Sequence, residues 1–187
     1  MSKAILDRVV ARFPDAVVST HAEHGDETVL LRREALRDVM TFLRDDSASA
    51  MSMLTDVTCV DYLGRVPSDG LMQPEPRFEL VYHLYSIDRK HRLRVKARVP
   101  EEDATIDTLS DLWKTANWLE REVWDLYGVR FRGHPDLRRI LLYEEFVGHP
   151  LRKDYPVDKR QPLVRRTDVE VVKRPVAADI RRGALEN

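Results

Sequence analysis

The sequence predicts an α+β domain in which helices cover one face of a mostly antiparallel sheet, followed by a long irregular extension. Segments with helical spacing of apolar residues alternate with segments in which every second residue is apolar. The alternating segments are joined by polar turns, which favours antiparallel pairing. After residue 130 the sequence contains five prolines and no sustained periodicity. We therefore expect the order α-β-β-α-β-β-β-α, with a globular domain at 1–130 and an extended arm at 131–187.

The first elements are two helices that flank a hairpin. Residues 3–12 have helical spacing that ends before Pro14. Residues 16–19 and 28–31 predict two short strands, joined by a polar link. Residues 33–43 predict a second helix, and its apolar face consists of Leu36, Val39, Met40 and Leu43.

Three longer strands are expected next. Residues 51–62 alternate, and one face should carry Met51, Met53, Val57 and Cys59. Residues 78–84 and 93–99 also alternate and are separated by a polar turn. A pairing of Leu84 with Val95 and of Tyr82 with Ala97 would place both apolar rows on one face of an antiparallel hairpin.

The last regular element is helical. Residues 109–127 repeat apolar positions at intervals of three and four, which predicts one helix or two in tandem, with Gly128 as the C-terminal cap. At least one of the tryptophans should lie in the core; these are Trp113, Trp118 and Trp124. Residues from about 160 onward are basic and weakly apolar, so beyond Arg165 we expect disorder in the isolated chain and order in a complex.

Composition limits the possible functions of this chain of 187 residues. The net charge is −1, which disfavours wholesale non-specific binding of nucleic acid. Cys59 is the single cysteine, so the chain alone cannot form a disulfide, an iron–sulfur cluster or a cysteine-rich zinc site. No apolar run approaches the roughly 20 residues of a membrane span, and the N-terminus is not a signal peptide. We expect membrane association only through another protein.

Nucleotide, flavin and hydrolase motifs are also absent from the sequence, which has no GxGxxG, GxxxxGK[ST], GxSxG or HExxH pattern. We therefore expect no catalytic residue, no cofactor-binding residue and no metal ligand in this chain. Two histidines, His134 and His149, each lie between a glycine and a proline. Imidazoles can bind metals or carry protons, but neither residue has the helical spacing of a metal-binding pair, so we disfavour a metal site.

Three carboxylates, Glu120, Glu122 and Asp125, fall within two turns of the last predicted helix. They could perform acid–base chemistry or bind a cation. They could instead form a solvated helix face, in which Arg121 pairs with Asp125. A third possibility is that they anchor arginines of the following segment, namely Arg130, Arg132, Arg138 and Arg139. We favour structural pairing over an interface role, and both over catalysis.

Basic residues form two further candidate sites. One strand face carries Arg92, Arg94, Lys96 and Arg98. This face could dock on phosphates or an acidic partner, but we favour a solvent-facing or edge strand whose charges prevent aggregation. The pairs at 138–139 and 152–153 are interleaved with acidic and aromatic residues, a composition that suits a protein–protein interface better than nucleic acid.

The segment 120–156 resembles the signature of the C subunit, or 30-kilodalton-type subunit, of respiratory complex I. It combines a Glu-Arg-Glu-x-x-Asp helix with a later Gly-His-Pro-Leu-Arg-Lys-Asp-Tyr-Pro stretch. The residues that carry the resemblance are Glu120, Arg121, Glu122, Asp125, Tyr127, Gly128, Phe131, His134, Pro135, Arg138, Arg139, Gly148, His149, Pro150, Leu151, Arg152, Lys153, Asp154, Tyr155 and Pro156. The N-terminal half agrees with the family in element order and is less distinctive.

This resemblance implies a cofactor-free subunit in the peripheral arm of the proton-pumping NADH:quinone oxidoreductase, on the cytoplasmic side of a bacterial inner membrane. The chain would have no redox centre, because FMN and the iron–sulfur clusters would lie in partner subunits. The motif residues would contact the large D (49-kilodalton-type) subunit, near the B and I subunits. Since the sequence ends at residue 187, we expect a separate subunit rather than a fusion with the 49-kilodalton-type protein.

Alternative functions remain open at this point. Related subunits occur in coenzyme-F420-linked dehydrogenases and in membrane-bound hydrogenases, where the electron donor would differ. A nucleic-acid-binding module using residues 92–98 and the basic tail would bind DNA or RNA with a steep salt dependence. An acid–base enzyme using the three carboxylates would need a nucleophile or cofactor motif, and we rank it last.

Overall fold

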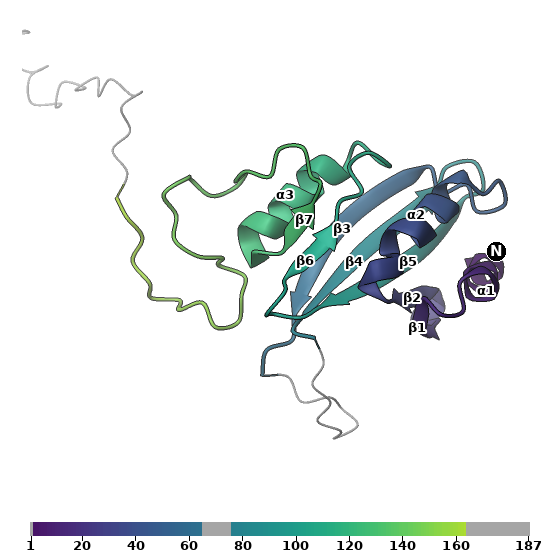
Figure 1. Ribbon diagram of the computed structural model, residues 1–187, viewed down its shortest axis with the longest axis horizontal. Coiled ribbons are helices and arrows are strands. Elements are labelled where there is room, and N and C mark those ends of the chain that lie inside the picture. The colour runs from purple at the N-terminus through teal and green to yellow at the C-terminus, as the bar shows by residue number, and fades with distance from the viewer. Residues whose placement is uncertain (1, 65–75, 164–187) are drawn as a thin grey trace, which may run out of the picture.

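The computed structural model describes residues 2–64 and 76–163 (Figure 1). Its elements are α1 (Ser2–Arg12), β1 (Val17–His21), η1 (Glu23–Gly25), β2 (Thr28–Leu31), η2 (Arg33–Ala35), α2 (Leu36–Asp45), β3 (Met53–Asp61), β4 (Phe78–Ser86), β5 (His91–Val99), β6 (Thr105–Asp107), α3 (Ala116–Tyr127) and β7 (Arg130–Arg132). The α+β class is confirmed. The predicted order lacks two strands, β6 and β7, because three residues are too few to show a periodic pattern.

The main sheet has five strands in the order β1-β2-β5-β4-β3. All neighbouring strands are antiparallel except β2 and β5, so the mostly antiparallel sheet is confirmed. The predicted hairpin of β1 and β2 is also confirmed. The parallel pair of β2 and β5 arises because α2 and two strands separate them in the chain, which allows a crossover. Strands β6 and β7 form a separate parallel pair.

The register of β4 and β5 differs from the prediction. Tyr82 pairs with Val95, and Leu84 pairs with Leu93, so β5 is displaced by two residues. The turn is shorter than expected, because Ser86 already pairs with His91 and its carbonyl accepts the N–H of Lys90 at 2.9 Å. A shift of two residues keeps each side chain on its face, so the apolar rows still lie together.

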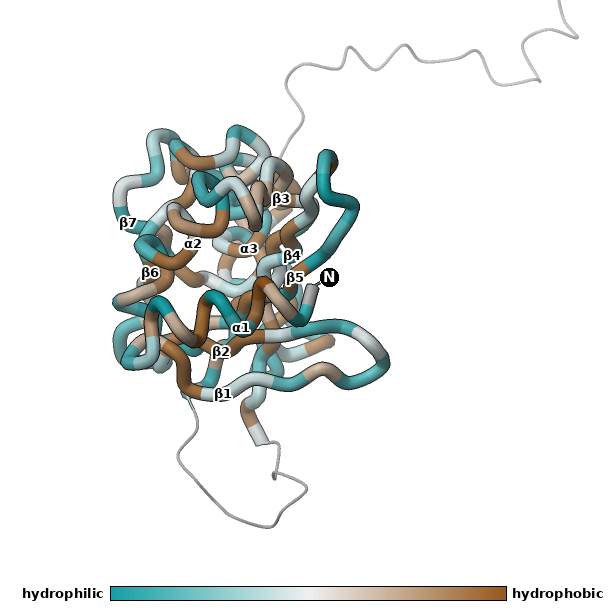
Figure 2. Tube along the Cα trace, turned by 90° about the vertical axis from the view of Figure 1, so that its right-hand side faces the viewer, coloured by the Kyte–Doolittle hydropathy of each residue, from teal (hydrophilic) through white to brown (hydrophobic). Residues whose placement is uncertain are grey.

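Helices cover one face of the sheet, as predicted. Figure 1 shows α2 and α3 in front of the strands, and Figure 2 shows hydrophobic stretches on the helices and on the strands they face. The predicted apolar face of α2 is buried at all four positions: Leu36, Val39, Met40 and Leu43. Trp113 is the buried tryptophan, and its indole N–H donates to the carbonyl of Met51 at 3.1 Å. Trp118 is instead exposed.

The predicted apolar face of β3 is wrong at one position. Val57 and Cys59 are buried, as is Met51 just before the strand, but Met53 is exposed and Leu54 takes its place in the core. The pairing with β4 is irregular between Leu54 and Asp56, so one extra residue reverses the alternation of side chains. A bulge of this kind leaves no clear mark in the sequence.

A single helix, α3, begins only at Ala116, and residues 109–115 form turns. Tertiary hydrogen bonds hold these turns, including one from the Thr115 hydroxyl to the carbonyl of Leu54 at 3.0 Å. The predicted cap is confirmed, because Gly128 is left-handed, with φ 79°, and its N–H donates to the carbonyl of Trp124.

An irregular segment follows β7, as predicted. Residues 133–163 contain turns and bends without a helix or strand, and their first part runs beside α3 (Figure 1). The tail that we expect beyond Arg165 lies outside the described residues. Among the helices that the structure describes, none is long and apolar enough to span a membrane.

Candidate functional site

The carboxylate of Asp125 organises the start of the irregular segment. This side chain is buried in the last turns of α3, and one oxygen accepts a hydrogen bond from Arg139 Nη1 at 2.6 Å. The other oxygen accepts three consecutive backbone N–H groups at 2.9–3.1 Å, from Ile140, Leu141 and Leu142. Burial alone would raise the pKa of Asp125, but these donors outweigh it and lower the pKa. The hypothesis that an acid of this helix anchors a following arginine is confirmed.

Two arginines fasten the segment to the helix. Arg139 also donates to the carbonyls of Phe146 and Gly148, at 2.9 and 3.2 Å. Arg121 donates to the carbonyls of Arg138 and Arg139, both at 3.1 Å. The alternative pairing of Arg121 with Asp125 is therefore wrong, because four donors from residues 139–142 already occupy that carboxylate.

The second half of the motif covers the C-terminal end of α3. His149 Nδ1 lies 2.9 Å from the carbonyl oxygen of Asp125. The Leu151 N–H donates to the carbonyl of Leu126 at 3.1 Å. Arg152 Nε donates to the carbonyl of Tyr127 at 2.6 Å. Carbonyls of a last helical turn have no partner within the helix, so residues 149–152 serve as its cap.

Gly128 permits this close approach. A Cβ atom at this position would lie 2.6 Å from both Arg152 Nη2 and His149 Nε2. A second glycine, Gly148, has a similar role, because a Cβ there would lie 2.9 Å from the ring of Tyr155. That ring stacks on Phe146 with centroids 6.1 Å apart. Both motif glycines are thus explained by packing within the chain.

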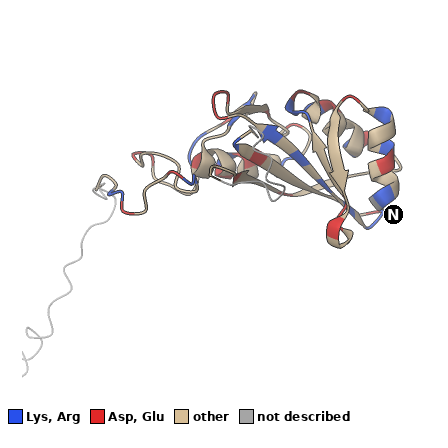
Figure 3. Cartoon of the chain, turned by 90° about the horizontal axis from the view of Figure 1, so that it is seen from below, with Lys and Arg blue, Asp and Glu red and all other residues tan. Residues whose placement is uncertain are grey.

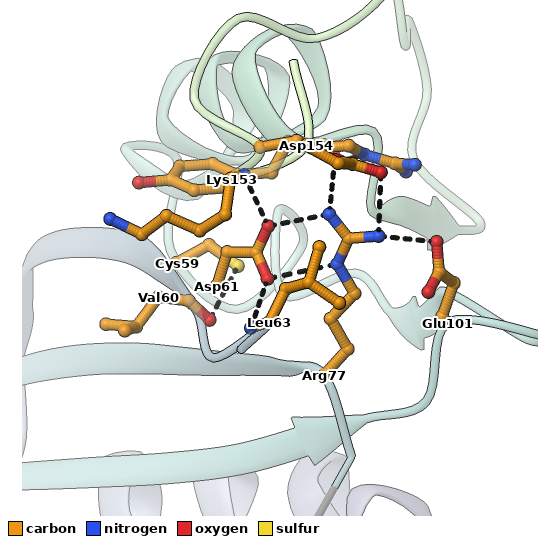
Figure 4. Close-up of polar contacts among 10 residues, drawn as sticks. Cys59, Val60, Asp61, Leu63, Arg77, Glu101, Lys153 and Asp154 are labelled. Atoms are coloured by element: carbon orange, nitrogen blue, oxygen red, sulfur yellow. Dashed lines mark hydrogen bonds and ion pairs between the residues drawn. The ribbon is translucent and has the colours of Figure 1, made fainter. Parts of the chain in front are cut away.

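A second buried carboxylate, Asp61, fixes the distal part of the motif to the sheet (Figure 4). It lies at the end of β3 and accepts the Arg77 guanidinium at 2.8 and 3.0 Å and the Lys153 N–H at 2.8 Å. Arg77 also donates to Asp154 at 2.6 Å and to Glu101 at 2.5 Å. Burial opposes ionisation, but these donors lower the pKa of Asp61 to about 2.

Sequence reasoning missed Asp61 and Arg77 as partners of the motif. One signal was available, because Asp61 continues the apolar row of Val57 and Cys59 along β3. A carboxylate on the apolar face of a strand requires a buried partner. The sequence pattern does not identify those partners, because Arg77 lies 16 residues away and the Lys153 N–H lies 92 residues away.

The three helix carboxylates do not converge on a catalytic site. Glu120 is buried and accepts hydrogen bonds from the Leu109 N–H at 2.7 Å and the Thr108 hydroxyl at 2.5 Å. Burial raises its pKa to about 7. Glu122 is exposed and has no side-chain hydrogen bond or ion pair with the described part of the chain. Each acid therefore has its own environment, and together they form no paired acid–base site.

The histidines have local structural contacts. His134 Nε2 lies 3.0 Å from the carbonyl of Asn117, and its Nδ1 accepts the Asp136 N–H at 3.1 Å. Burial lowers the pKa of His149. No group of three or more His, Cys, Asp or Glu side chains could hold a metal ion within residues 2–64 and 76–163.

The basic row on β5 lies on the open face of the sheet. β5 is a central strand, so the edge-strand interpretation is wrong and the solvent-facing one is right. Carboxylates balance the row: Arg94 pairs with Asp26 at 2.9 Å, and Glu79 pairs with Lys96 at 2.8 Å and Arg98 at 3.0 Å. Figure 3 shows blue and red bands close together on the strands. Arg92 lies over the ring of Tyr85.

The exposed side of the segment 141–163 carries both apolar and charged side chains, and the charged ones are Glu144, Glu145, Lys153, Asp154, Asp158, Lys159 and Arg160. It contains six of the twelve large hydrophobic side chains that are exposed in the described structure: Leu141, Tyr143, Val147, Leu151, Val157 and Leu163. Among the remaining motif residues, Phe131 is buried, and Pro135, Arg138, Lys153 and Pro156 are exposed. Polar anchors thus face the domain, while large apolar side chains lie exposed among charged ones on the other side.

Comparison with known proteins gives a consistent result. Residues 29–161 match the model of the family described as "Respiratory-chain NADH dehydrogenase, 30 Kd subunit". The C subunit of NADH-quinone oxidoreductase from Geobacter metallireducens is 52% identical over 146 residues, which are 78% of this chain and 84% of the relative. The second such C subunit of Rhizobium meliloti is 41% identical over 163 residues, or 84% of each chain.

Solved structures show the same fold. A trypsin-resistant fragment of Nqo5 is 35% identical, with a TM-score of 0.61, and the match covers 72% of this chain and 98% of the fragment. A chain of the membrane-bound sulfane sulfur reductase, an archaeal respiratory membrane complex, has a TM-score of 0.66 at 22% identity, over 91% and 99% of the two chains. The protein described here belongs to the 30-kilodalton subunit family of the respiratory-chain NADH dehydrogenase, as its motif predicts.

Proposed function

We propose that this chain is a cofactor-free structural subunit of NADH:quinone oxidoreductase, which transfers electrons from NADH through FMN and iron–sulfur clusters to quinone and couples this transfer to proton translocation. It would lie in the peripheral arm, on the cytoplasmic side of a bacterial inner membrane. Its contact with the membrane would be only through the complex. Membership of the 30-kilodalton family, and relatives named as the C subunit of NADH-quinone oxidoreductase, support this proposal.

The observation that carries the proposal is the two-sided arm. Asp125 and Asp61 hold the backbone of residues 138–153 against the domain. Six large apolar side chains are exposed on this arm among charged ones, and two of them, Val157 and Leu163, are fully exposed. Apolar groups gathered on an ordered surface mark a protein interface. We propose that the arm, residues 131–187, docks on the D (49-kilodalton-type) subunit, near the B and I subunits.

The cysteine content supports a role without an iron–sulfur cluster in this chain. A cluster needs several cysteine ligands, and the chain has one. Cys59 is buried on β3, and burial raises the pKa of its thiol to about 12, which disfavours the thiolate that would bind a metal. We propose that the iron–sulfur clusters, and also FMN, lie in partner subunits.

The alternatives have less support. The likeness to the sulfane sulfur reductase concerns the fold alone at 22% identity, whereas the relatives of higher identity are named as NADH-quinone oxidoreductase subunits. The pairing of Lys96 and Arg98 with Glu79 weakens the positive field that a nucleic-acid interface on β5 would need.

The first experiment is purification of the tagged chain from mildly solubilised membranes, with identification of co-purifying subunits and an assay of NADH:quinone activity. Recovery of iron–sulfur and membrane subunits with inhibitor-sensitive activity would support the proposal. Hydrogenase or F420-type partners would change the electron donor. Recovery of the chain alone, from the soluble fraction, would overturn it.

A matched pair of variants tests the arm itself. Val147 on the arm and Val18 on β1 are exposed to similar extents, 54% and 57%. Val147→Asp should reduce the amount of assembled complex on native gels, because it places a charge in an apolar interface. Val18→Asp should leave the amount of assembled complex unchanged, because Val18 lies on β1 and not on the arm. Equal assembly of the two variants would show that this side of the arm does not bind a partner.

A further inference from the structure

The arginines that follow α3 have different roles. Four of them, Arg130, Arg132, Arg138 and Arg139, occur within ten residues. Only Arg139 turns inward, to Asp125. The other three are exposed. Arg132 pairs with Asp107, and Arg138 with Asp136, both at 2.9 Å. Arg130 has no side-chain hydrogen bond or ion pair within the described structure.

A groove of about 350 Å³ lies beside these arginines, between β7 and the start of the arm. It is lined by Thr105, Trp124, Arg130, Phe131, Arg132 and Leu137. The indole of Trp124 and the side chain of Leu137 are half-buried and provide an apolar surface. The guanidinium of Arg139 lies 5.8 Å from the Trp124 ring and helps to hold this indole in place.

The charges around the groove indicate what it binds. Two arginines line it, Arg130 and Arg132, and Asp107 pairs with Arg132, so one positive charge, on Arg130, is left without a counter-ion among the described residues. An arginine next to a tryptophan is a frequent combination at the energetic centre of protein interfaces. The volume suits one or two side chains rather than a whole helix.

We propose that this groove seats an acidic segment of a partner subunit, with a carboxylate on Arg130 and a neighbouring apolar side chain against Trp124. The proposal rests on the proposed function, because it requires that the chain works inside an assembled complex. It adds a second contact, on β7 and the C-terminal half of α3, to the exposed apolar side chains of the arm. The guanidinium can bind a carboxylate with two parallel hydrogen bonds, which would fix the register of the partner.

Site-specific crosslinking identifies the occupant. A photo-crosslinking amino acid at position 132, on the rim, leaves Arg130 and Trp124 intact, and the complex is purified from membranes before irradiation. The expected product joins this chain to another subunit within a few residues of an Asp or Glu. A control at position 92, on the open face of the sheet, should not give that product. Crosslinks only within this chain, to a segment without acidic residues, or to nucleic acid would overturn the proposal.

Charge variants at Arg130 test whether its positive charge strengthens the binding of this chain to the complex. Because this side chain is exposed and unpaired, Arg130→Glu should leave the thermal unfolding of the full chain unchanged. In the complex it should lower, by about twofold or more, the salt concentration that releases the chain from membranes, since surface charge pairs are screened by salt. Arg130→Lys should have a smaller effect, and Arg92→Glu none.

The two proposals fail in different ways. If Val147→Asp releases the chain and Arg130→Glu is retained like the unsubstituted chain, the groove proposal is wrong and the proposed function stands. If the unsubstituted chain does not co-purify with an NADH:quinone oxidoreductase, the proposed function is wrong.

Discussion

Asp125 and Arg139 form a buried ion pair at 2.6 Å between the last turns of α3 and a residue that follows 14 positions later. The same carboxylate accepts the next three backbone N–H groups of the chain. One side chain thus determines the path of the arm as it leaves the domain. A buried charge of this kind is costly when it loses its partner, which makes the pair a sensitive point of the structure.

Asp125→Ala should destabilise the full chain by about 3–5 kcal/mol, because Arg139 would remain partly buried without its counter-ion and three N–H groups would lose their acceptor. Urea unfolding of the isolated chain measures this change. The control is Glu122→Ala on the same helix, whose exposed side chain should contribute less than about 0.5 kcal/mol. Similar midpoints for the two variants would contradict the anchoring role.

Glu120 should make stability depend on pH. Burial raises its pKa from 4.5 to about 7, so the folded state holds a proton that the unfolded state releases. The contribution of this proton to the free energy of unfolding is fully present below pH 4.5, decreases as pH rises and is lost above about pH 7. Its size is about 3 kcal/mol.

Glu120→Gln, which mimics the protonated acid, should remove this dependence. The free energy of unfolding, measured from pH 5 to pH 8, should fall more steeply for the unsubstituted chain than for the variant. Parallel curves would show that Glu120 does not take up a proton on folding.

Asp61→Asn should loosen the distal part of the motif without unfolding the domain. Arg77 keeps Asp154 and Glu101 as partners, whereas the Lys153 N–H loses a charged acceptor. A hydrogen bond to a charged group contributes about 1.5–3 kcal/mol, so local opening should increase about tenfold or more. Trypsin cleavage after Arg152 and Lys153 measures this opening. Cleavage at an unchanged rate would argue against Asp61 as an anchor.

Gly128→Ala should cost more than a left-handed backbone alone. Its Cβ would meet Arg152 and His149 at 2.6 Å, whereas a Cβ at Gly25, with a similar φ of 82°, meets nothing within 4 Å. Gly25→Ala therefore reports the backbone strain, about 1–3 kcal/mol. The excess loss of stability in Gly128→Ala, from thermal unfolding, reports the packing of the motif on α3. Equal losses of stability in the two variants would mean that Arg152 and His149 move aside without a measurable loss of stability.

The sequence predicted the parts of this fold that follow a local period. The buried face of α2 and the cap at Gly128 depend on residues a few positions apart. The register of β4 and β5, and the exposure of Met53, depend on a tight turn and a bulge that leave the alternation of residue types unchanged.

The sequence of the arm shows no periodic pattern. Polar contacts with residues far away in the chain hold the arm against the domain, and such contacts need no regular spacing of apolar residues. Its anchors include Asp61, which bonds to Lys153 across 92 positions of the chain. Residue types alone could indicate that Asp125 binds one of the following arginines, but not which one. The partner-facing role of the arm is a proposal from its exposed apolar side chains and from the family.

The cap on α3 has a consequence for engineering. Residues 149–152 bond to the last carbonyls of α3. The segment 128–148 is therefore a loop whose two ends both lie at the C-terminal end of this helix. The entropy of closing a loop grows only slowly with its length. A short flexible insertion between Glu144 and Glu145, both exposed, should therefore leave the domain folded while it blocks the docking proposed for the arm. The insertion should thus separate the folding of this protein from the assembly proposed for it.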